Sequence, residues 1–151
     1  MNLKITLIAL GLVAAGHAGS AAAVLGGDVA SVETDKAALG AGAVQTSTGD
    51  GYAVHEMQAA SGTTIREYVS ASGAVFAVTW SGPALPDLRQ LLGVHFDTYT
   101  EAARAQNAGP GRIEVQRGGL VVQSAGQMRA FFGRAYLAAL VPQGMALDQI
   151  R

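Results

Sequence analysis

The sequence predicts an α+β domain in which two antiparallel β-meanders flank one central helix that packs on the sheet, in the order βββ-α-βββ. Three observations lead to this prediction. The tripeptide Ala-Ser-Gly occurs at residues 60–62 and again at 71–73, each time between β-rich runs. A stretch with apolar residues at helical spacing begins at Pro86. Two more glycine-containing turns follow that stretch, which indicates the second meander.

Length and composition limit the classes of protein to which the chain can belong. It has 151 residues, which is enough for one domain, and it is 50% hydrophobic and only 14% charged. So small a charged fraction argues against a disordered chain or one that wraps nucleic acid, because such chains are rich in charge. The formal net charge is -1, so no large electrostatic field is directed at phosphates or membranes. Cysteine is absent, which excludes disulfides, thiolate metal sites and cysteine nucleophiles.

The first segment has the pattern of a secretory signal peptide, which we place at residues 1–23. A cationic start at Lys4 precedes an apolar run over 5–15, and small residues continue to Ala23, after which we expect cleavage. The apolar run is too short to span a membrane, which takes about 20 residues. No cysteine lies at the cut to carry a lipid. We therefore expect a soluble mature chain without a membrane anchor, either periplasmic or secreted.

Residues 24–50 are rich in small residues, and we expect a loosely ordered segment before the single α+β domain at 51–151. A short helix is predicted from Asp28, as the N-cap, to Leu39, with Val29 and Val32 on one face. The stretch from Gly40 to Gly51 is predicted to be a loop.

The first predicted meander comprises Tyr52–Ala59, Thr63–Val69 and Ala74–Trp80. Three-residue turns with glycine in the left-handed conformation place Glu56 opposite Arg66, whereas a two-residue turn places it opposite Glu67. Like charges directly opposite are destabilising, so the first register is preferred. That register also gives the following pairs: Met57 with Ile65, Val54 with Tyr68, His55 with Glu67, Val69 with Val75 and Tyr68 with Phe76.

The central helix is predicted to begin at Pro86-Asp87 and to end near Ala105. Gly93 weakens its middle by about 1 kcal/mol relative to alanine. Its apolar face is formed by residues at helical spacing: Leu88, Leu91, Leu92, His95, Phe96 and Tyr99.

The second meander is predicted from a two-residue turn at Gly118-Gly119 and a three-residue loop at Ser124-Ala125-Gly126. This register gives a sheet with one dry and one solvated face. The expected dry face carries Val115, Leu120, Val122, Met128 and Phe132. The expected solvated face carries Glu114, Gln116, Val121, Gln123 and Arg129. A short helix ending at Ile150 is expected in the last stretch of the chain, Leu137 to Arg151.

Several stretches resemble a family of small exported proteobacterial proteins known as domain of unknown function 2844. They are Leu25–Asp28, Ser61–Val69, Val75–Pro83, Pro86–Leu88, Leu91–Gly93, Gly119–Ser124, Met128–Phe131 and Gly133–Tyr136. The resemblance spans nearly the whole mature chain. It implies no catalytic residue, because the family has no assigned activity. The family pattern leads us to expect Gly and His where this chain has Ala125 and Gln127.

Candidate catalytic and metal-binding patterns are weak. His55-Glu56 begins an H-E-x-x-H motif, but residue 59 is alanine and the pair lies in a predicted strand. With only His95 as a second histidine in the mature chain, we expect no metal and no cofactor. Glu56 and Glu67 would suit sugar hydrolysis only in the rejected register. A Ser-His-Asp triad from distant residues stays open, because triads are recognised by geometry.

One group of side chains indicates a candidate ligand or partner surface: Arg66, Tyr68, Trp80, Arg129 and Arg134. Arginines beside aromatic rings bind acidic or sugar-like ligands through stacking and forked hydrogen bonds. The alternative is a solvated sheet face with ordinary cross-strand pairs, and a lone tryptophan such as Trp80 is more often a core residue.

The function expected from the sequence is that of a non-catalytic binding or accessory protein of the cell envelope. Its partner would be an envelope protein or a small ligand, bound on a sheet face or along a free sheet edge. The alternative is a small hydrolase that uses His55 or His95, which requires a cleft holding that histidine beside a serine or an acid.

Overall fold

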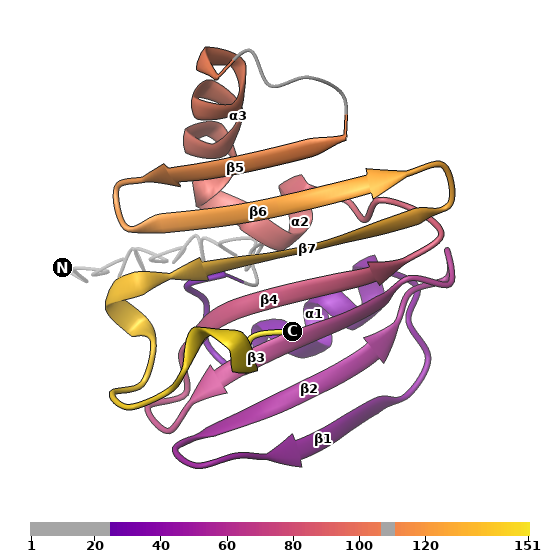
Figure 1. Ribbon diagram of the computed structural model, residues 1–151. Coiled ribbons are helices and arrows are strands. Elements are labelled where there is room, and N and C mark those ends of the chain that lie inside the picture. The colour runs from indigo at the N-terminus through magenta and orange to yellow at the C-terminus, as the bar shows by residue number, and fades with distance from the viewer. Residues whose placement is uncertain (1–24, 107–110) are drawn as a thin grey trace, which may run out of the picture.

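Seven antiparallel strands form one sheet in the order β1-β2-β3-β4-β7-β6-β5 (Figure 1). The computed structural model describes residues 25–106 and 111–151, so the expected signal peptide lies outside the described residues. The strands are β1 Val44–Thr48, β2 Tyr52–Gln58, β3 Thr64–Ser70, β4 Val75–Gly82, β5 Arg112–Arg117, β6 Leu120–Gln127 and β7 Ala130–Leu137. The α+β class with two meanders and a helix between them is confirmed.

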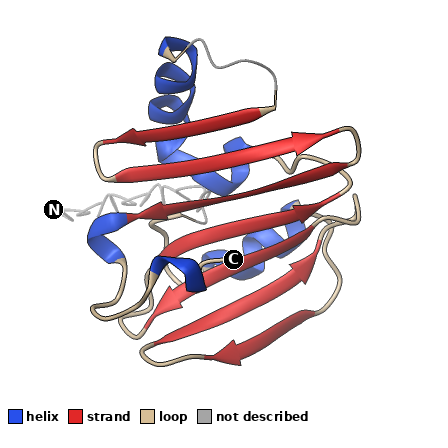
Figure 2. Cartoon of the chain, in the orientation of Figure 1, coloured by secondary structure: helices blue, strands red, loops and turns tan. Residues whose placement is uncertain are grey.

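Helices cover one face of the sheet, and the C-terminal segment, residues 138–151, covers part of the other. The helices are α1 Ser31–Ala38, α2 Leu88–Leu92, the single turn η1 Gly93–His95, and α3 Phe96–Ala105. In Figure 1, α1 and α2 lie behind the strands, whereas the last residues lie in front of them. Figure 2 shows two short helical turns in that front segment, η2 Ala138–Leu140 and η3 Leu147–Gln149. The predicted short helix near Ile150 is therefore confirmed.

Two apolar clusters fill the two faces. The helix-covered cluster joins the helices to the sheet through Leu91 and Leu92, which are fully buried with Ile65, Val78, Trp80 and Val122 among others. The smaller cluster lies under the C-terminal segment and comprises Tyr68, Phe76, Ala77, Val121, Tyr136 and Ile150. Successive residues of the central strands thus point alternately into the two apolar clusters.

The Ala-Ser-Gly turns set the register of the first meander as predicted. Gly62 and Gly73 have φ values of 84° and 85°, the left-handed conformation that glycine adopts without strain. Met57 pairs with Ile65, Val54 with Tyr68, Glu56 with Arg66, His55 with Glu67 and Val69 with Val75. The predicted pair of Tyr68 with Phe76 is wrong, because a bulge between Tyr68 and Val69 shifts Tyr68 to Ala77.

The segment before the first meander is more ordered than expected. The loop predicted over Gly40–Gly51 contains the edge strand β1, which pairs with β2. The predicted helix begins at Ser31, two residues later than an N-cap at Asp28 would give. The Asp28 side chain accepts a hydrogen bond from the Ala30 N–H and does not cap the helix. Leu25 and Val32 are buried in the helix-covered cluster, so this segment is part of the same fold.

The central helix is interrupted where glycine weakens it. Asp87 caps α2 by accepting hydrogen bonds from the N–H groups of Arg89 and Gln90. The backbone then breaks at Gly93, whose φ is 51°, before α3 continues to Ala105.

The second meander has the predicted first turn but not the predicted second one. Gly118 and Gly119 both have positive φ, and Arg117 pairs with Leu120. The loop expected at Ser124–Gly126 is wrong, because β6 continues to Gln127 and turns at Met128-Arg129. Gly126 meets a packing need instead: a Cβ there would lie 2.6 Å from the ring of Phe131.

The later turn changes which residues face the core. Met128 and Phe132, expected on the dry face, are 94% and 58% exposed. Val121, expected on the solvated face, is only 6% exposed because the C-terminal segment covers it together with Tyr136. The expectation of one dry and one solvated face is therefore wrong for this half of the sheet.

Replacing Gly133 with alanine is expected to lower the free energy of unfolding by about 1–3 kcal/mol, the usual cost of overpacking a core. A Cβ at Gly133 would collide with the ring of Trp80 and lie 2.6 Å from the carbonyl oxygen of Gln123. Urea unfolding followed by circular dichroism measures the change. Gly42→Ala is the matched control, because nothing lies within 4 Å of its Cβ. Equal stabilities for the two variants would contradict this account of the β4–β7 contact.

Candidate functional site

A groove of about 920 Å³ lies on the face of the sheet that carries the C-terminal segment. Both meanders contribute to it, and residues 149–151 form part of its wall. Its charged and aromatic lining residues are Arg66, Arg112, Arg134, Arg151, Tyr52, Tyr68, Trp80 and Phe132. Such a volume lies within the range of about 300–1,000 Å³ that is usual for small-molecule sites.

The charge of the lining has one sign. Four arginines line the groove, and none of its lining residues in the described part of the chain is an aspartate or glutamate. Two acids stand at its margin: Glu56 is 2.6 Å from Arg66, and Glu114 is 3.8 Å from Arg112. Because each of these acids offsets a single cation, the groove keeps an excess of positive charge.

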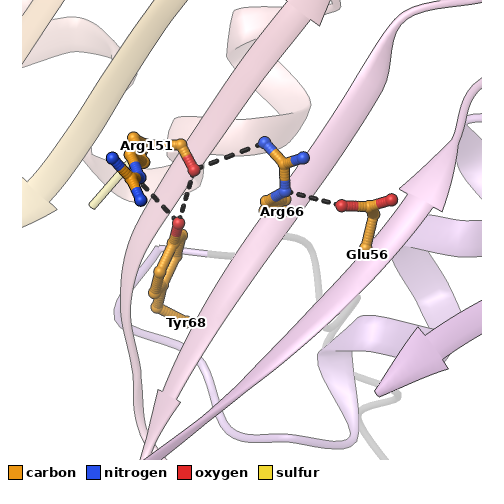
Figure 3. A network of polar contacts seen from close by, with 4 residues as sticks. All are labelled: Glu56, Arg66, Tyr68 and Arg151. Carbon is orange, nitrogen blue, oxygen red and sulfur yellow. Dashed lines mark hydrogen bonds and ion pairs between the residues drawn. The ribbon is translucent and has the colours of Figure 1, made fainter. Parts of the chain in front are cut away.

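Arg66 and Tyr68 belong to one network with the end of the chain (Figure 3). The Tyr68 hydroxyl donates to the main-chain oxygen of Arg151 at 2.7 Å and accepts from the Arg151 N–H at 3.0 Å. Arg66 donates through Nε to Glu56 at 2.6 Å and through Nη1 to the same Arg151 oxygen at 3.3 Å. Residues 66 and 68 point to this face together because they are two apart on β3.

Arg134 has an equivalent place in the second meander. Its Nε donates to Gln123 at 2.7 Å, and Gln123 in turn donates to Glu114 at 3.0 Å. Its Nη1 donates to the main-chain oxygens of Leu147 at 2.6 Å and Ile150 at 3.3 Å. Its guanidinium also lies 5.9 Å from the ring centre of Tyr136. The side chain is thus held in place by partners on three sides.

The structure brings together three of the five residues predicted as a ligand surface: Arg66, Tyr68 and Arg134. Trp80 borders the groove but is only 2% exposed and packs in the helix-covered cluster, so it offers almost no surface to a ligand. Arg129 does not line the groove, because the later β6–β7 turn places it at the tip of the hairpin. Trp80 and Arg129 therefore add almost no surface to the groove.

Sequence reasoning missed Arg112, Gln123 and Arg151. Arg112 and Gln123 lie on β5 and β6, and the pairing of β4 with β7 brings them to the same face as Arg66. That pairing is non-local and has no signal in a short stretch of sequence. Arg151 reaches the groove only through the return of the C-terminal segment across the sheet.

The family is established by a match over nearly the whole described chain. A model of the family described as "protein of unknown function (DUF2844)" matches residues 21–150. The chain belongs to this family. No curated protein and no solved structure matches the DUF2844 chain. Since the family is described as having unknown function, membership assigns no role to any residue of the groove.

The two histidines that the structure describes, His55 and His95, do not line the groove of the DUF2844 chain. His55 contacts Thr46, with 3.1 Å between Nδ1 and Oγ1, although it stands opposite Glu67 in the register. Glu67 was expected to supply the partner of His55, and this expectation is wrong. His95 ends the turn η1 on the helix side.

Two carboxyl groups are fully buried on the helix-covered side: Asp35 on α1 and Glu67 on β3. Asp35 accepts a hydrogen bond from the Gln90 side chain. Within the described residues, the second Asp35 oxygen and both Glu67 oxygens have no hydrogen-bond partner, and neither has the indole nitrogen of Trp80. Glu56 and Glu67 face opposite sides of the sheet, so they do not form a catalytic pair of acids.

Burial changes the acidity of these two groups. Desolvation raises the pKa of Glu67 to about 8, and the nearby charge of Asp35 adds to the effect. Desolvation also raises the pKa of Asp35 to about 6, against the hydrogen bond from Gln90, which lowers it. At neutral pH Glu67 is therefore mostly protonated, which suits a carboxyl group that no cation neutralises.

Neither a metal cluster nor a membrane helix is found in the parts of the chain that the structure describes. No group of three or more potential metal-binding side chains occurs within residues 25–106 and 111–151. In the same residues, no helix has the length and apolar character needed to cross a bilayer.

The stability of the DUF2844 protein is expected to fall as the pH rises from about 5 to about 8. The folded-state pKa of Glu67, about 8, lies above its ordinary value of 4.5, so the folded state binds this proton more tightly. As the pH rises through that window, Glu67 loses its proton in the unfolded chain first. The free energy of unfolding therefore falls by a few kcal/mol, at about 1.4 kcal/mol per pKa unit. Urea unfolding at a series of pH values measures this loss.

Glu67→Gln should remove most of this pH dependence, because the amide stays neutral at every pH. Glu56→Gln, an acid on the other face of the sheet, is the matched control and should keep the wild-type slope. If Glu67→Gln loses stability with pH as steeply as the wild type, the buried carboxyl is not the source.

Proposed function

We propose that this DUF2844 protein is an exported, non-catalytic binding protein of the cell envelope whose groove binds an acidic ligand. The observation that carries the proposal is the lining of four arginines without any aspartate or glutamate among the described residues. Guanidinium groups stay charged at all physiological pH values and form forked bonds to carboxylates and phosphates. A ligand carrying such groups is therefore the chemistry that the groove favours.

The aromatic residues add a second element of recognition. Tyr52 and Phe132 line the same groove, and Phe132 is 58% exposed. Arginine beside aromatic faces suits a ligand with both an acidic group and an apolar or planar part. The guanidinium of Arg112 is available to such a ligand because its side chain is 79% exposed.

The absence of a base in the groove favours binding over catalysis. Hydroxyl groups of Ser47, Ser81 and Ser124 lie along it, but neither described histidine does. A serine nucleophile needs an adjacent base within hydrogen-bond reach. The hydrolase alternative therefore receives no support from this geometry.

The position of the expected cleavage site supports export. The expected cut after Ala23 lies just before the described residues, which start at the buried Leu25. The Gly26 N–H donates to the carbonyl oxygen of Val75 at 2.8 Å, so the mature chain would join the sheet within a few residues of the cut.

Export is tested by expressing the full chain with its own residues 1–23 in a Gram-negative host. We expect a periplasmic or culture-medium product whose N-terminus, by mass spectrometry, is Val24. Ala23→Asp should block this cleavage, because the pattern requires small residues there, whereas Ala22→Asp at the tolerant middle position should not. A cytoplasmic product that retains its leader would contradict export.

Ligand binding is tested by isothermal titration of the folded protein with citrate and with pyrophosphate as probes. Arg112→Gln is expected to weaken binding about tenfold, or about 1.4 kcal/mol. It should leave the fold intact, since Arg112 is exposed and its one ion pair spans 3.8 Å. Added salt should weaken binding further.

Arg129→Gln is the matched control, because Arg129 is an exposed arginine outside the groove. Its affinity for both probes should equal that of the wild type. The proposal is wrong if neither probe binds, or if the Arg129 and Arg112 variants weaken binding equally.

A further inference from the structure

Side chains of the sheet hold the tail, Leu147–Arg151, by its main-chain atoms. Arg134 donates to the carbonyl oxygens of Leu147 and Ile150, at 2.6 and 3.3 Å. Tyr68 and Arg66 converge on the main-chain oxygen of Arg151, as Figure 3 shows. None of the hydrogen bonds found among the described residues uses a side chain of the tail.

A single side chain of the tail is buried. Ile150 is 0% exposed and lies in the smaller apolar cluster beside Tyr68, Phe76, Val121 and Tyr136. The tail residues around it are exposed, with Leu147 at 43%. The sheet therefore recognises the tail by its backbone and by one branched aliphatic group.

The same combination of contacts can hold a short peptide that belongs to another molecule. Main-chain hydrogen bonds provide affinity that does not depend on sequence, and a side-chain pocket provides specificity. Arginine and tyrosine donors that reach main-chain oxygens can accept any peptide placed in the same way. The tail therefore marks both the path and the pocket of a peptide site.

We propose that the acidic ligand is a short peptide with a branched aliphatic residue, and that the tail occupies part of its site as a tethered competitor. This inference rests on the proposed function, since Arg66, Arg112 and Arg134, which stay in place when the tail leaves, would bind the carboxylates of that peptide. The peptide gains the contacts of Arg66, Tyr68 and Arg134 by displacing the tail.

The tether determines how strongly the tail competes. A short link gives a tethered segment an effective concentration in the millimolar range. Only molecules in which the tail is displaced can bind free peptide, so the apparent affinity is lowered in proportion to their fraction. Unseating the tail should accordingly raise the apparent affinity for a peptide without adding any new contact.

The experiment uses full-length mature protein and a fluorescein-labelled peptide with the sequence of residues 146–151, Ala-Leu-Asp-Gln-Ile-Arg. Ile150→Asp unseats the tail and is expected to bind the peptide at least tenfold more tightly than the wild type, by fluorescence anisotropy. Leu147→Asp is the matched control, since Leu147 is already partly exposed, and should show no gain. A peptide with aspartate in place of its isoleucine should not bind.

A second measurement applies if Ile150→Asp fails to fold by circular dichroism. Millimolar peptide is added to the wild-type protein, and amide hydrogen exchange is followed. Exchange at Ile150 and Arg151 should accelerate while that of β3 stays unchanged. A folded Ile150→Asp variant that gains no affinity, or tail amides that do not respond to peptide, would overturn the inference.

Citrate titration separates this inference from the proposed function. If citrate binds in an Arg112-dependent way but the peptide binds neither protein, the acidic groove stands and the peptide assignment fails. If neither citrate nor peptide binds, both fail.

Discussion

The pairing of β4 with β7 is the interaction on which the rest of the structure depends. It joins two separate meanders into one sheet through the pairs that run from Ala77–Tyr136 to Gly82–Phe131. At its centre, Gly133 leaves room for the ring of Trp80, so that the two strands can lie together with a large side chain between sheet and helices. Residues Val75–Trp80 are buried throughout, because both faces of the sheet are covered here.

The groove follows from the same junction. Arg66 and Tyr68 come from the first meander, whereas Gln123 and Arg134 come from the second. Within β3, neighbouring residues are directed to opposite layers: Arg66 toward the groove and Glu67 into the helix-covered core. A single strand thus presents a cation on one side and keeps a protonated acid on the other, which leaves the groove free of that carboxylate.

Local chemistry explains which parts of this structure could be predicted. The first meander was predictable because Gly62 and Gly73 need positive φ and because Glu56 and Arg66 fit only one register. β1 was missed because its residues are polar and mostly exposed, so no alternation marks it. Gly126 was misassigned because a glycine required by a close ring contact looks, in sequence, like a turn glycine. Of the candidate site, Arg66, Tyr68 and Arg134 were predicted from the sequence. The other residues reach the groove through the β4–β7 pairing and the return of the C-terminal segment, which leave no signal in a short stretch of sequence.

The long separation between β4 and β7 has a consequence for how the molecule is assembled. Tyr136 lies roughly sixty residues beyond its partner Ala77, and contacts that close such long loops form slowly. Until they form, each meander is a half-sheet with a bare edge, and the apolar run Val75–Val78 lies along one of these edges. The pairing of β4 with β7 therefore also removes an edge to which another chain could add a strand.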